Sequence, residues 1–292
     1  MRAAVLLGFD VPERALSPFQ AFEIELIKLD DLHGGAPVDA ALVLGGDGTI
    51  HRHLRTLIEQ KIPVLPVPMG SGNDFAHALG INSIQDAVSA FQQFCSATQN
   101  VKTIDVGLIC SQPGHSQLEA GNSKPETYFC NVAGVGLDCE ANRRANAMPR
   151  WLRRHGGYIF AAVSAILSFR PTVVTITTDD GKISQPAALV AVANTTSYGG
   201  GMRIAPHAQL ADGLLDICFI RQTGRFRLLR GFPRVFRGEH LTLPEAEYFQ
   251  ASRLRIEAER PLLLYADGEP VCETPLEIEI VPKALQVIVP MR

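Results

Sequence analysis

A glycine-rich turn around one acid is the first part of the sequence whose residue types could carry chemistry. Residues 43–54 read VLGGDGTIHRHL, so an apolar run ends in three glycines around Asp47 and continues into a helical pattern. Backbone N–H groups and the partial positive charge at a helix start can bind a phosphate without any lysine. The same glycines could instead serve only to turn the chain from strand to helix. This stretch alone leaves both interpretations open.

A second turn of the same kind follows one strand later. Residues 66–80 read PVPMGSGNDFAHALG, and Asn73 or Asp74 is expected to cap the helix that begins there. In a parallel sheet both turns leave the carboxyl edge of neighbouring strands, where open α/β sheets bind ligands. There is no GxxxxGK[ST], and no GxGxxG follows the first strand, so a P-loop and a dinucleotide fingerprint are excluded. The pair of turns predicts a nucleotide site of another kind.

The elements that must position these turns predict two lobes. Strand and helix patterns alternate through residues 1–100, which indicates an N-terminal open parallel α/β domain; the segment 17–32 fits either a helix or a helix plus a strand. Residues 101–292 contain successive strand patterns and are expected to form a mainly antiparallel β-sandwich domain. Two stretches inside it, residues 148–169 and 225–240, have helical character. A length of 292 residues suits two domains.

Composition narrows the class of protein further. The chain has 27 Lys plus Arg against 30 Asp plus Glu, a net charge of −3, which predicts no nucleic-acid partner. Its six cysteines are never closer than nine positions, so they are expected to be reduced thiols rather than zinc ligands. The longest apolar stretch, Tyr158 to Leu167, is too short to span a membrane. A cytoplasmic protein is expected.

Together these motifs resemble the diacylglycerol kinase catalytic family of lipid kinases, which includes bacterial lipid kinases, sphingosine kinases and ceramide kinases. After GGDGTI and PMGSGNDFAHALG, the resemblance continues through NVAGVGLDCEA, YGGGMRIAPHAQLADGLLDI and YADGE, and so spans nearly the whole chain in order. NAD kinases and phosphofructokinases share the GGDG turn but not the later motifs. The resemblance implies an ATP-dependent phosphotransferase that transfers the γ-phosphoryl group to a lipid hydroxyl, such as that of diacylglycerol.

The resemblance also implies roles for particular residues. The proton acceptor corresponds to Glu269, with Asp267 beside it and Asp47 across a cleft between the lobes. Mg²⁺ is expected as a cofactor, with a structural ion in the second lobe held by the Asp212 side chain and the carbonyls of Gln209 and Leu214; a plain turn is the alternative there. The residues expected around ATP are Gly45, Gly46, Asp47, Gly48, Thr49, Ile50, His51, Arg52, Gly70, Ser71, Gly72, Asn73 and Asp74.

A lipid substrate predicts a surface that can meet a membrane. Residues 225–240 carry five arginines against Glu239, with leucines and phenylalanines between them, a pattern typical of helices that lie on anionic lipid. Residues 148–160 are similar, with Trp151 as a candidate anchor. A solvated basic face that packs its leucines inward is the alternative. We therefore expect peripheral association with the inner face of the membrane; the oligomeric state is open, with a homodimer as one alternative.

The sequence departs from the family pattern at three places. Members usually follow their first strand with an Asn-Pro and Ser/Thr-Gly turn, which is absent here, and they have Asn-Glu where His51 and Arg52 stand. Ser71 replaces the usual threonine. Alternatives follow: an active lipid kinase in which Arg52 supplies charge to the phosphates, a weak or inactive relative that binds nucleotide or lipid, and an enzyme that acts on a soluble substrate, as NAD kinases do.

Overall fold

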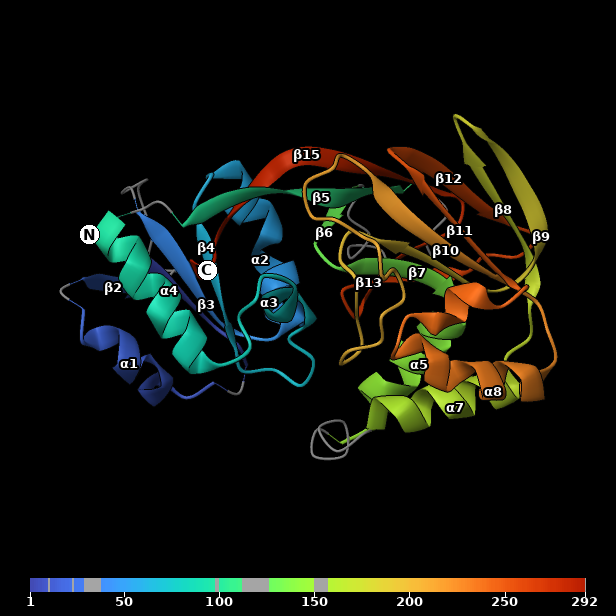
Figure 1. The fold of residues 1–292 in the computed structure, drawn as a ribbon, viewed down its shortest axis with the longest axis horizontal. Helices are drawn as coiled ribbons and strands as arrows, with labels where there is room; N and C mark the ends of the chain where they lie inside the picture. The colour runs from blue at the N-terminus through green and yellow to red at the C-terminus, as the bar shows by residue number, and fades with distance from the viewer. Residues whose placement is uncertain are drawn as a thin grey trace. The chain divides into compact units, whose positions relative to one another are not determined.

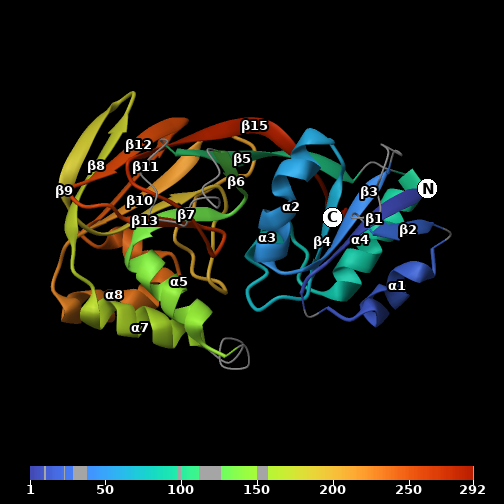
Figure 2. The same ribbon diagram turned by 180° about the vertical axis from the view of Figure 1, so that it is seen from behind.

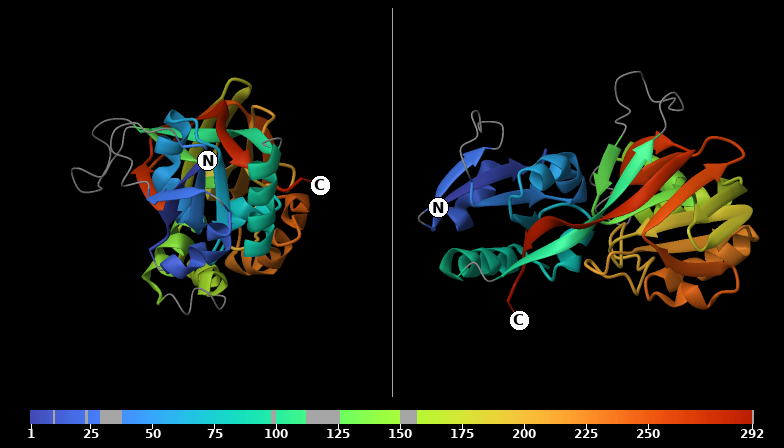
Figure 3. Two further views of the ribbon diagram at one scale, coloured as in Figure 1. Left: turned by 90° about the vertical axis from the view of Figure 1, so that its left-hand side faces the viewer. Right: turned by 90° about the horizontal axis from the view of Figure 1, so that it is seen from above.

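The chain forms two compact units (Figure 1). The computed structural model describes residues 1–9, 11–22, 24–28, 38–97, 100–111, 126–149 and 157–291. Unit 1 comprises Met1–Val106 and Pro282–Arg292, and unit 2 comprises Gly107–Val281. Both boundaries fall inside strands, β5 (Val101–Ser111) and β15 (Leu276–Ile288), which pair with each other (Figure 3). The functional division predicted after residue 100 stays a prediction.

Unit 1 is built on a parallel sheet in the order β2-β1-β3-β4. Its continuous apolar strands are buried, as expected of a parallel sheet covered by helices; every residue of β3 is buried. The predicted strand and helix alternation is confirmed, and the ambiguous segment 17–32 contains a helix and a strand. The elements of this unit are β1 (Arg2–Leu7), η1 (Glu13–Leu16), α1 (Ser17–Gln20), β2 (Glu25–Lys28), β3 (Ala40–Gly45), α2 (Asp47–Glu59), β4 (Val64–Pro68), α3 (Asp74–Ala78) and α4 (Ile84–Ala97).

Unit 2 is a mainly antiparallel β-sandwich. Its strands follow the order β14-β13-β7-β9-β8-β12-β15, and β10 and β11 continue from β9. Side chains from these strands share one buried apolar core, which includes Val135, Ile217 and Leu264. The strands are β6 (Glu126–Phe129), β7 (Val132–Gly136), β8 (Thr172–Thr178), β9 (Gly181–Ala193), β10 (Leu215–Arg221), β11 (Ala246–Ala251), β12 (Arg253–Ala258), β13 (Leu263–Ala266) and β14 (Glu269–Glu273).

Three helices lie together along one side of unit 2 (Figure 2). Helices α7 (Tyr158–Ser168) and α8 (Arg225–Val235) confirm the two helical stretches, and a short 3-10 turn, η4 (Glu239–Thr242), ends the second. Trp151 lies outside the described residues. Helix α5 (Leu137–Ala147), which packs on α7, was not predicted. Among the helices in the described ranges, none is long and apolar enough to cross a bilayer.

Candidate active site

The two glycine turns of unit 1 pack directly against each other. Strands β3 and β4 pair in parallel, with Gly45 beside Pro68, so both turns leave the same edge of the sheet. A Cβ atom built on Gly70 would lie 2.5 Å from the Cα of Gly46, and one built on Gly46 would lie 3.0 Å from the Cα of Gly70. Only glycine at both positions permits this approach. The predicted convergence of the two turns is therefore confirmed.

Asp47 joins the two turns through hydrogen bonds. It begins α2 in the first turn, and its carboxylate accepts the backbone N–H groups of Asp74 at 3.1 Å and Phe75 at 2.9 Å, which begin α3. Of the two residues expected to cap α3, Asn73 stands at the cap position but has a left-handed backbone with φ of 58° and makes no side-chain cap, and Asp74 is already the first residue of the helix. Its amide oxygen instead accepts the N–H of Gly70 at 2.7 Å. The N–H groups at the start of α3 are therefore bonded to Asp47, which is distant in sequence, and not to the neighbouring Asn73 side chain.

The other residues expected around ATP lie on these turns or just behind them. Thr49 covers Gly45, whose Cβ, if present, would lie 2.4 Å from the threonine hydroxyl. Ser71 is exposed in the second turn. His51 and Arg52 are the fifth and sixth residues of α2, beyond its first turn, and Arg52 is exposed. Since helix dipole effects fall off within the first turn, these two side chains would reach a phosphate by their length and not by backbone position.

In unit 2 the YADGE motif forms a tight hairpin, residues 266–269, which we call the DGE turn. Ala266 pairs with Glu269, and the two central residues have positive φ, 50° for Asp267 and 87° for Gly268. That geometry is a type I′ turn, for which Asp-Gly is a preferred sequence. The carboxylate of Asp267 accepts the N–H groups of Cys130 at 2.9 Å and Asn131 at 2.8 Å. These bonds favour a positioning role for Asp267, which the sequence had placed among the catalytic acids.

Glu269 differs from Asp267 in its surroundings. It is the first residue of β14 and is exposed, at the point where the hairpin leaves its turn. An exposed carboxylate at this position can accept a proton from an incoming hydroxyl. The role predicted for Glu269 therefore agrees with its position and remains a prediction.

The predicted structural metal site lies in the turn before β10. Asp212 is exposed, and its carboxylate accepts the N–H of Leu214 at 3.1 Å and an amide hydrogen of Gln250 at 3.4 Å. Asp216 nearby is fully buried, and one of its carboxylate oxygens, Oδ2, has no hydrogen-bond partner. Burial raises the pKa of Asp216, and the charge of Asp212 adds to this rise.

The predicted ligands, the Asp212 carboxylate and the carbonyls of Gln209 and Leu214, are all oxygens, which are the ligands that Mg²⁺ prefers. The orphaned Asp216 oxygen lies outside this set. Within the described part of the chain no three His, Cys, Asp or Glu side chains gather into a metal-binding group. The predicted set of Gln209, Asp212 and Leu214 contains a single carboxylate and stays a prediction.

A third glycine turn, which was not predicted, leads from β7 into α5. Gly136 has φ of 97°, and a Cβ there would lie 2.6 Å from the carbonyl oxygen of Ala188, so glycine is required. Asp138 follows it, buried, and accepts hydrogen bonds from Tyr198 and from Asn142. Burial raises the pKa of Tyr198, and the charge of Asp138 raises it further. The sequence GVGLD repeats the glycine-then-acid order of the other two turns, which is the signal that could have identified it.

An apolar pocket lies beneath the three helices of unit 2. It has a volume of about 110 Å³ and is lined mainly by aliphatic and aromatic side chains from α7, α8 and the strands below, among them Ile166, Leu189, Leu228 and Phe232. Gly231, the one buried residue of α8, also lines it. An apolar cavity of this order of size favours apolar groups over water.

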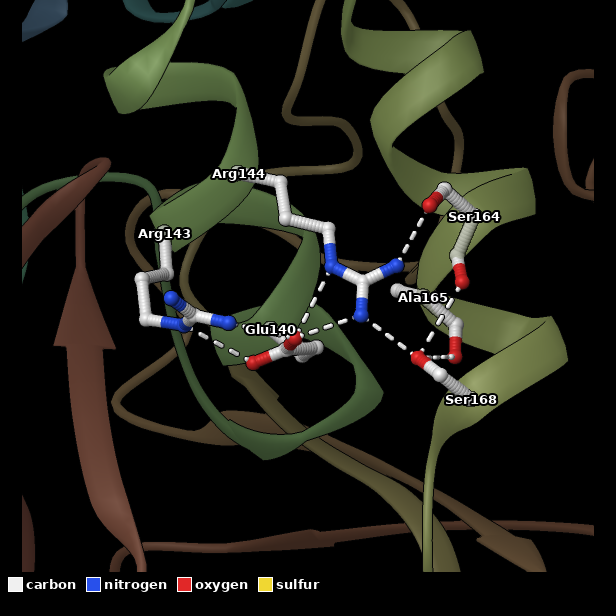
Figure 4. A network of polar contacts seen from close by, with 6 residues as sticks. All are labelled: Glu140, Arg143, Arg144, Ser164, Ala165 and Ser168. Carbon is white, nitrogen blue, oxygen red and sulfur yellow. Dashed lines mark hydrogen bonds and ion pairs between the residues drawn. The ribbon is translucent and has the colours of Figure 1, made fainter.

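A polar network joins α5 to α7 (Figure 4). Glu140 accepts hydrogen bonds from Arg143 and from Arg144, whose Nε lies 2.8 Å away. Arg144 also donates to the hydroxyls of Ser164 and Ser168 on α7. The hydrogen bond from Arg143 is the main cause that lowers the pKa of Glu140. Helix α5 is thus bonded to α7, and both helices line the pocket, α5 through Ala141 and α7 through Ile166.

Comparison with known proteins identifies the family. Residues 28–109 match the diacylglycerol kinase catalytic domain, and residues 131–289 match the YegS C-terminal NAD kinase beta sandwich-like domain. The diacylglycerol kinase of Mycobacterium tuberculosis (strain ATCC 25618 / H37Rv) is 36% identical over 253 residues, which cover 86% of this chain and 77% of that protein. The chain therefore belongs to the diacylglycerol kinase and YegS-like family of lipid kinases.

Solved structures support the same fold. A crystal structure of a Bacillus anthracis protein, provisionally named a diacylglycerol kinase, has a TM-score of 0.74 at 22% identity and covers 99% of this chain and 97% of that chain. An NAD kinase from Archaeoglobus fulgidus, solved in complex with ATP, has a TM-score of 0.53 at 15% identity and covers 99% of this chain and 94% of that chain. The expected combination of an α/β lobe and a C-terminal β lobe is confirmed.

Proposed function

We propose that this chain transfers the γ-phosphoryl group of ATP to a hydroxyl of a membrane lipid such as diacylglycerol. The observation that carries the proposal is the direct packing of Gly46 against Gly70, with Asp47 bonded across both turns. The start of α2 and the second glycine turn meet at one edge of a parallel sheet, where ligands of open α/β sheets bind, and a helix start there suits a polyphosphate. Asp47 itself accepts the N–H groups that begin α3 and so holds the second turn beside this helix start. We further propose that residues 1–100 bind the nucleotide and that residues 101–292 supply Glu269 and the surface that binds the lipid.

Phosphoryl transfer depends mainly on positioning and on stabilising the charge of the phosphate oxygens. The glycine turns would hold the phosphates through backbone N–H groups, and the Arg52 guanidinium would add positive charge. Glu269 would accept the proton of the attacking hydroxyl. Mg²⁺ bound with ATP would neutralise developing negative charge, and because this ion usually keeps several waters, one carboxylate oxygen, as from Asp47, suffices on the protein side.

The apolar pocket of unit 2 is the site we propose for an acyl chain of the acceptor. Gly231 and Leu243 both line the pocket, and a Cβ at position 231 would lie 3.0 Å from the Leu243 side chain, so Gly231→Leu should occupy pocket space and displace Leu243 slightly. We expect the KM for a long-chain diacylglycerol to rise about tenfold, with the KM for ATP unchanged. Steady-state kinetics with long-chain and short-chain acceptors measure this, and the short-chain acceptor should be affected less. Equal effects on both acceptors would mean that the acyl chain binds outside this pocket.

The outer faces of α7 and α8 form the surface that we propose meets the membrane. Phe160 is 67% exposed and Phe226 89% exposed, beside exposed Ile159 and Leu167. Arg225, Arg230, Arg234 and Arg237 are exposed on α8 and the segment after it. Because aromatic and cationic groups occur together there, the partner that fits this surface is an anionic bilayer.

Replacing both Phe160 and Phe226 by serine should weaken binding to anionic vesicles by about tenfold or more, because each ring loses apolar area that the bilayer would bury. Co-sedimentation with vesicles measures the affinity. Phe9→Ser is the matched control, since Phe9 is 85% exposed but belongs to unit 1. If the control weakens binding as much as the double variant, α7 and α8 are not the docking surface.

The proposed reaction is tested with ATP labelled in its γ-phosphoryl group and vesicles that contain diacylglycerol. We expect label in the lipid fraction, dependent on Mg²⁺ and absent after chelation with EDTA. ATP that binds without any transfer to lipid would support the inactive alternative, and transfer to NAD instead of lipid would support the NAD kinase-like one.

A further inference from the structure

The DGE turn is held by contacts on two sides. On one side, the Asp267 carboxylate accepts the N–H groups of Cys130 and Asn131, and the Asp267 N–H donates to the carbonyl of Val132 at 3.1 Å. On the other side, the side-chain amide of Asn146 donates to the carbonyl oxygen of Gly268 at 3.1 Å. The first set of bonds fixes the position of the turn. The second bond fixes the peptide that joins Gly268 to Glu269.

The hydrogen bond from Asn146 matters because Gly268, whose carbonyl accepts it, has a flexible backbone. A glycine adopts positive and negative φ about equally well, so its backbone carries little rotational restraint of its own. A Cβ built on Gly268 would meet no atom within 4 Å, which means that no close packing surrounds this point of the turn. The orientation of the Gly268–Glu269 peptide, and with it the direction in which the Glu269 side chain leaves the hairpin, therefore depends on hydrogen bonds.

Asn146 is well placed to supply that restraint because α5 is itself anchored. The residue is in the last turn of α5. Two residues earlier, Arg144 bonds to Ser164 and Ser168 of α7, and four residues earlier, the Asn142 amide donates to buried Asp138 at 3.3 Å. The amide of Asn146 thus extends from a fixed helix to a turn that has little packing of its own.

We propose that Asn146 is a positioning residue, which holds the Gly268 carbonyl and so orients the Glu269 carboxylate toward the acceptor hydroxyl. The inference rests on the proposed role of Glu269 as proton acceptor. It also makes α5 a link within unit 2, since the helix that lines the acyl pocket through Ala141 also sets the direction of the proposed base.

Two replacements of Asn146 test the kinetic consequence. Asn146→Leu keeps the approximate shape but removes the donor, and we expect kcat to fall about 3- to 30-fold with both KM values within about twofold. Asn146→Gln keeps a donor on a longer side chain and should recover part of the loss. Asn82→Ala is the matched control, because this exposed asparagine donates to the Gly80 carbonyl in unit 1. It should leave kcat unchanged.

The Tm of each variant shows whether a loss of kcat comes from unfolding, and Asn146→Leu should melt within about 2 °C of the control, as expected for one exposed hydrogen bond. An unchanged kcat in Asn146→Leu would overturn the proposal. So would a fall in kcat that comes with an equal rise in the KM for lipid, since a positioned base acts on the chemical step.

Hydrogen–deuterium exchange of the segment 262–273 tests the positioning without any activity. In Asn146→Leu the amides of the DGE turn should exchange about 3- to 10-fold faster than in the unsubstituted chain, while exchange in β4 stays unchanged. If the unsubstituted chain transfers no phosphate to lipid, the proposed function fails and exchange alone decides the positioning role. Unchanged exchange would overturn it.

Discussion

Replacing Glu269 by glutamine should lower kcat by about 10²- to 10⁴-fold and leave the affinity for ATP within about twofold. Glutamine has nearly the same shape but cannot accept the proton of the attacking hydroxyl. Glu269 is exposed at the start of β14, so the substitution leaves no buried group unpaired and should not unfold the chain. Steady-state kinetics with vesicle-bound diacylglycerol, together with direct ATP titration, separate the loss of chemistry from a loss of binding.

Glu273→Gln provides the control for this substitution. Glu273 ends the same strand, four residues beyond Glu269 and away from the DGE turn. It should retain nearly full turnover. If Glu269→Gln turns over as fast as this control, Glu269 is not the proton acceptor. If both variants lose activity together, the loss comes from β14 and not from one carboxylate.

Replacing Gly70 by alanine should abolish ATP binding at concentrations that saturate the unsubstituted chain. The new Cβ would lie 2.5 Å from the Gly46 Cα, and since both are backbone positions at strand ends, the two turns must separate. A displacement of about 1 Å within a site can lower the reaction rate about 100-fold, and here the groups displaced are those that we expect to bind the phosphates. The bonds from Asp47 to the start of α3 span the same gap, so we also expect a lower Tm.

Gly224→Ala is the matched control for Gly70→Ala. Gly224 precedes α8 with φ of −63°, and a Cβ there would meet nothing within 4 Å. Alanine should therefore be tolerated, with ATP titration and Tm unchanged. Normal ATP affinity in Gly70→Ala would mean that the contact between the glycine turns does not form the nucleotide site.

The sequence predicted the parallel lobe well because its signals are local. Apolar runs that end in glycine specify buried strands such as β3, and the spacing of Ile50, Leu54 and Leu57 specifies the buried face of α2. Helix α5 was missed because LDCEANRRANA has few large apolar residues. Its buried face consists of small and polar side chains, such as Ala141 and Asn142, which no hydrophobic period reveals.

The surroundings of the acids in the site could not be predicted from the sequence. Asp47 and Asp267 were both predicted from motifs, but their hydrogen-bond partners lie 27 and 137 positions away, at Asp74 and Cys130. Such partners depend on tertiary packing, so the structural bonds of these two acids could not be predicted from the motifs that contain them. Asp216 is another example, since the sequence does not reveal that this acid is buried.

The proposed lipid kinase activity is tested most directly by incubating the purified chain with ATP, Mg²⁺ and a total lipid extract, followed by mass spectrometry of the lipids. We expect one class of lipid alcohol to gain about 80 Da, the mass of one phosphoryl group, and Glu269→Gln to prevent the gain. No shifted lipid, in a sample whose protein still binds ATP, would contradict the claim that this member of the family is an active lipid kinase.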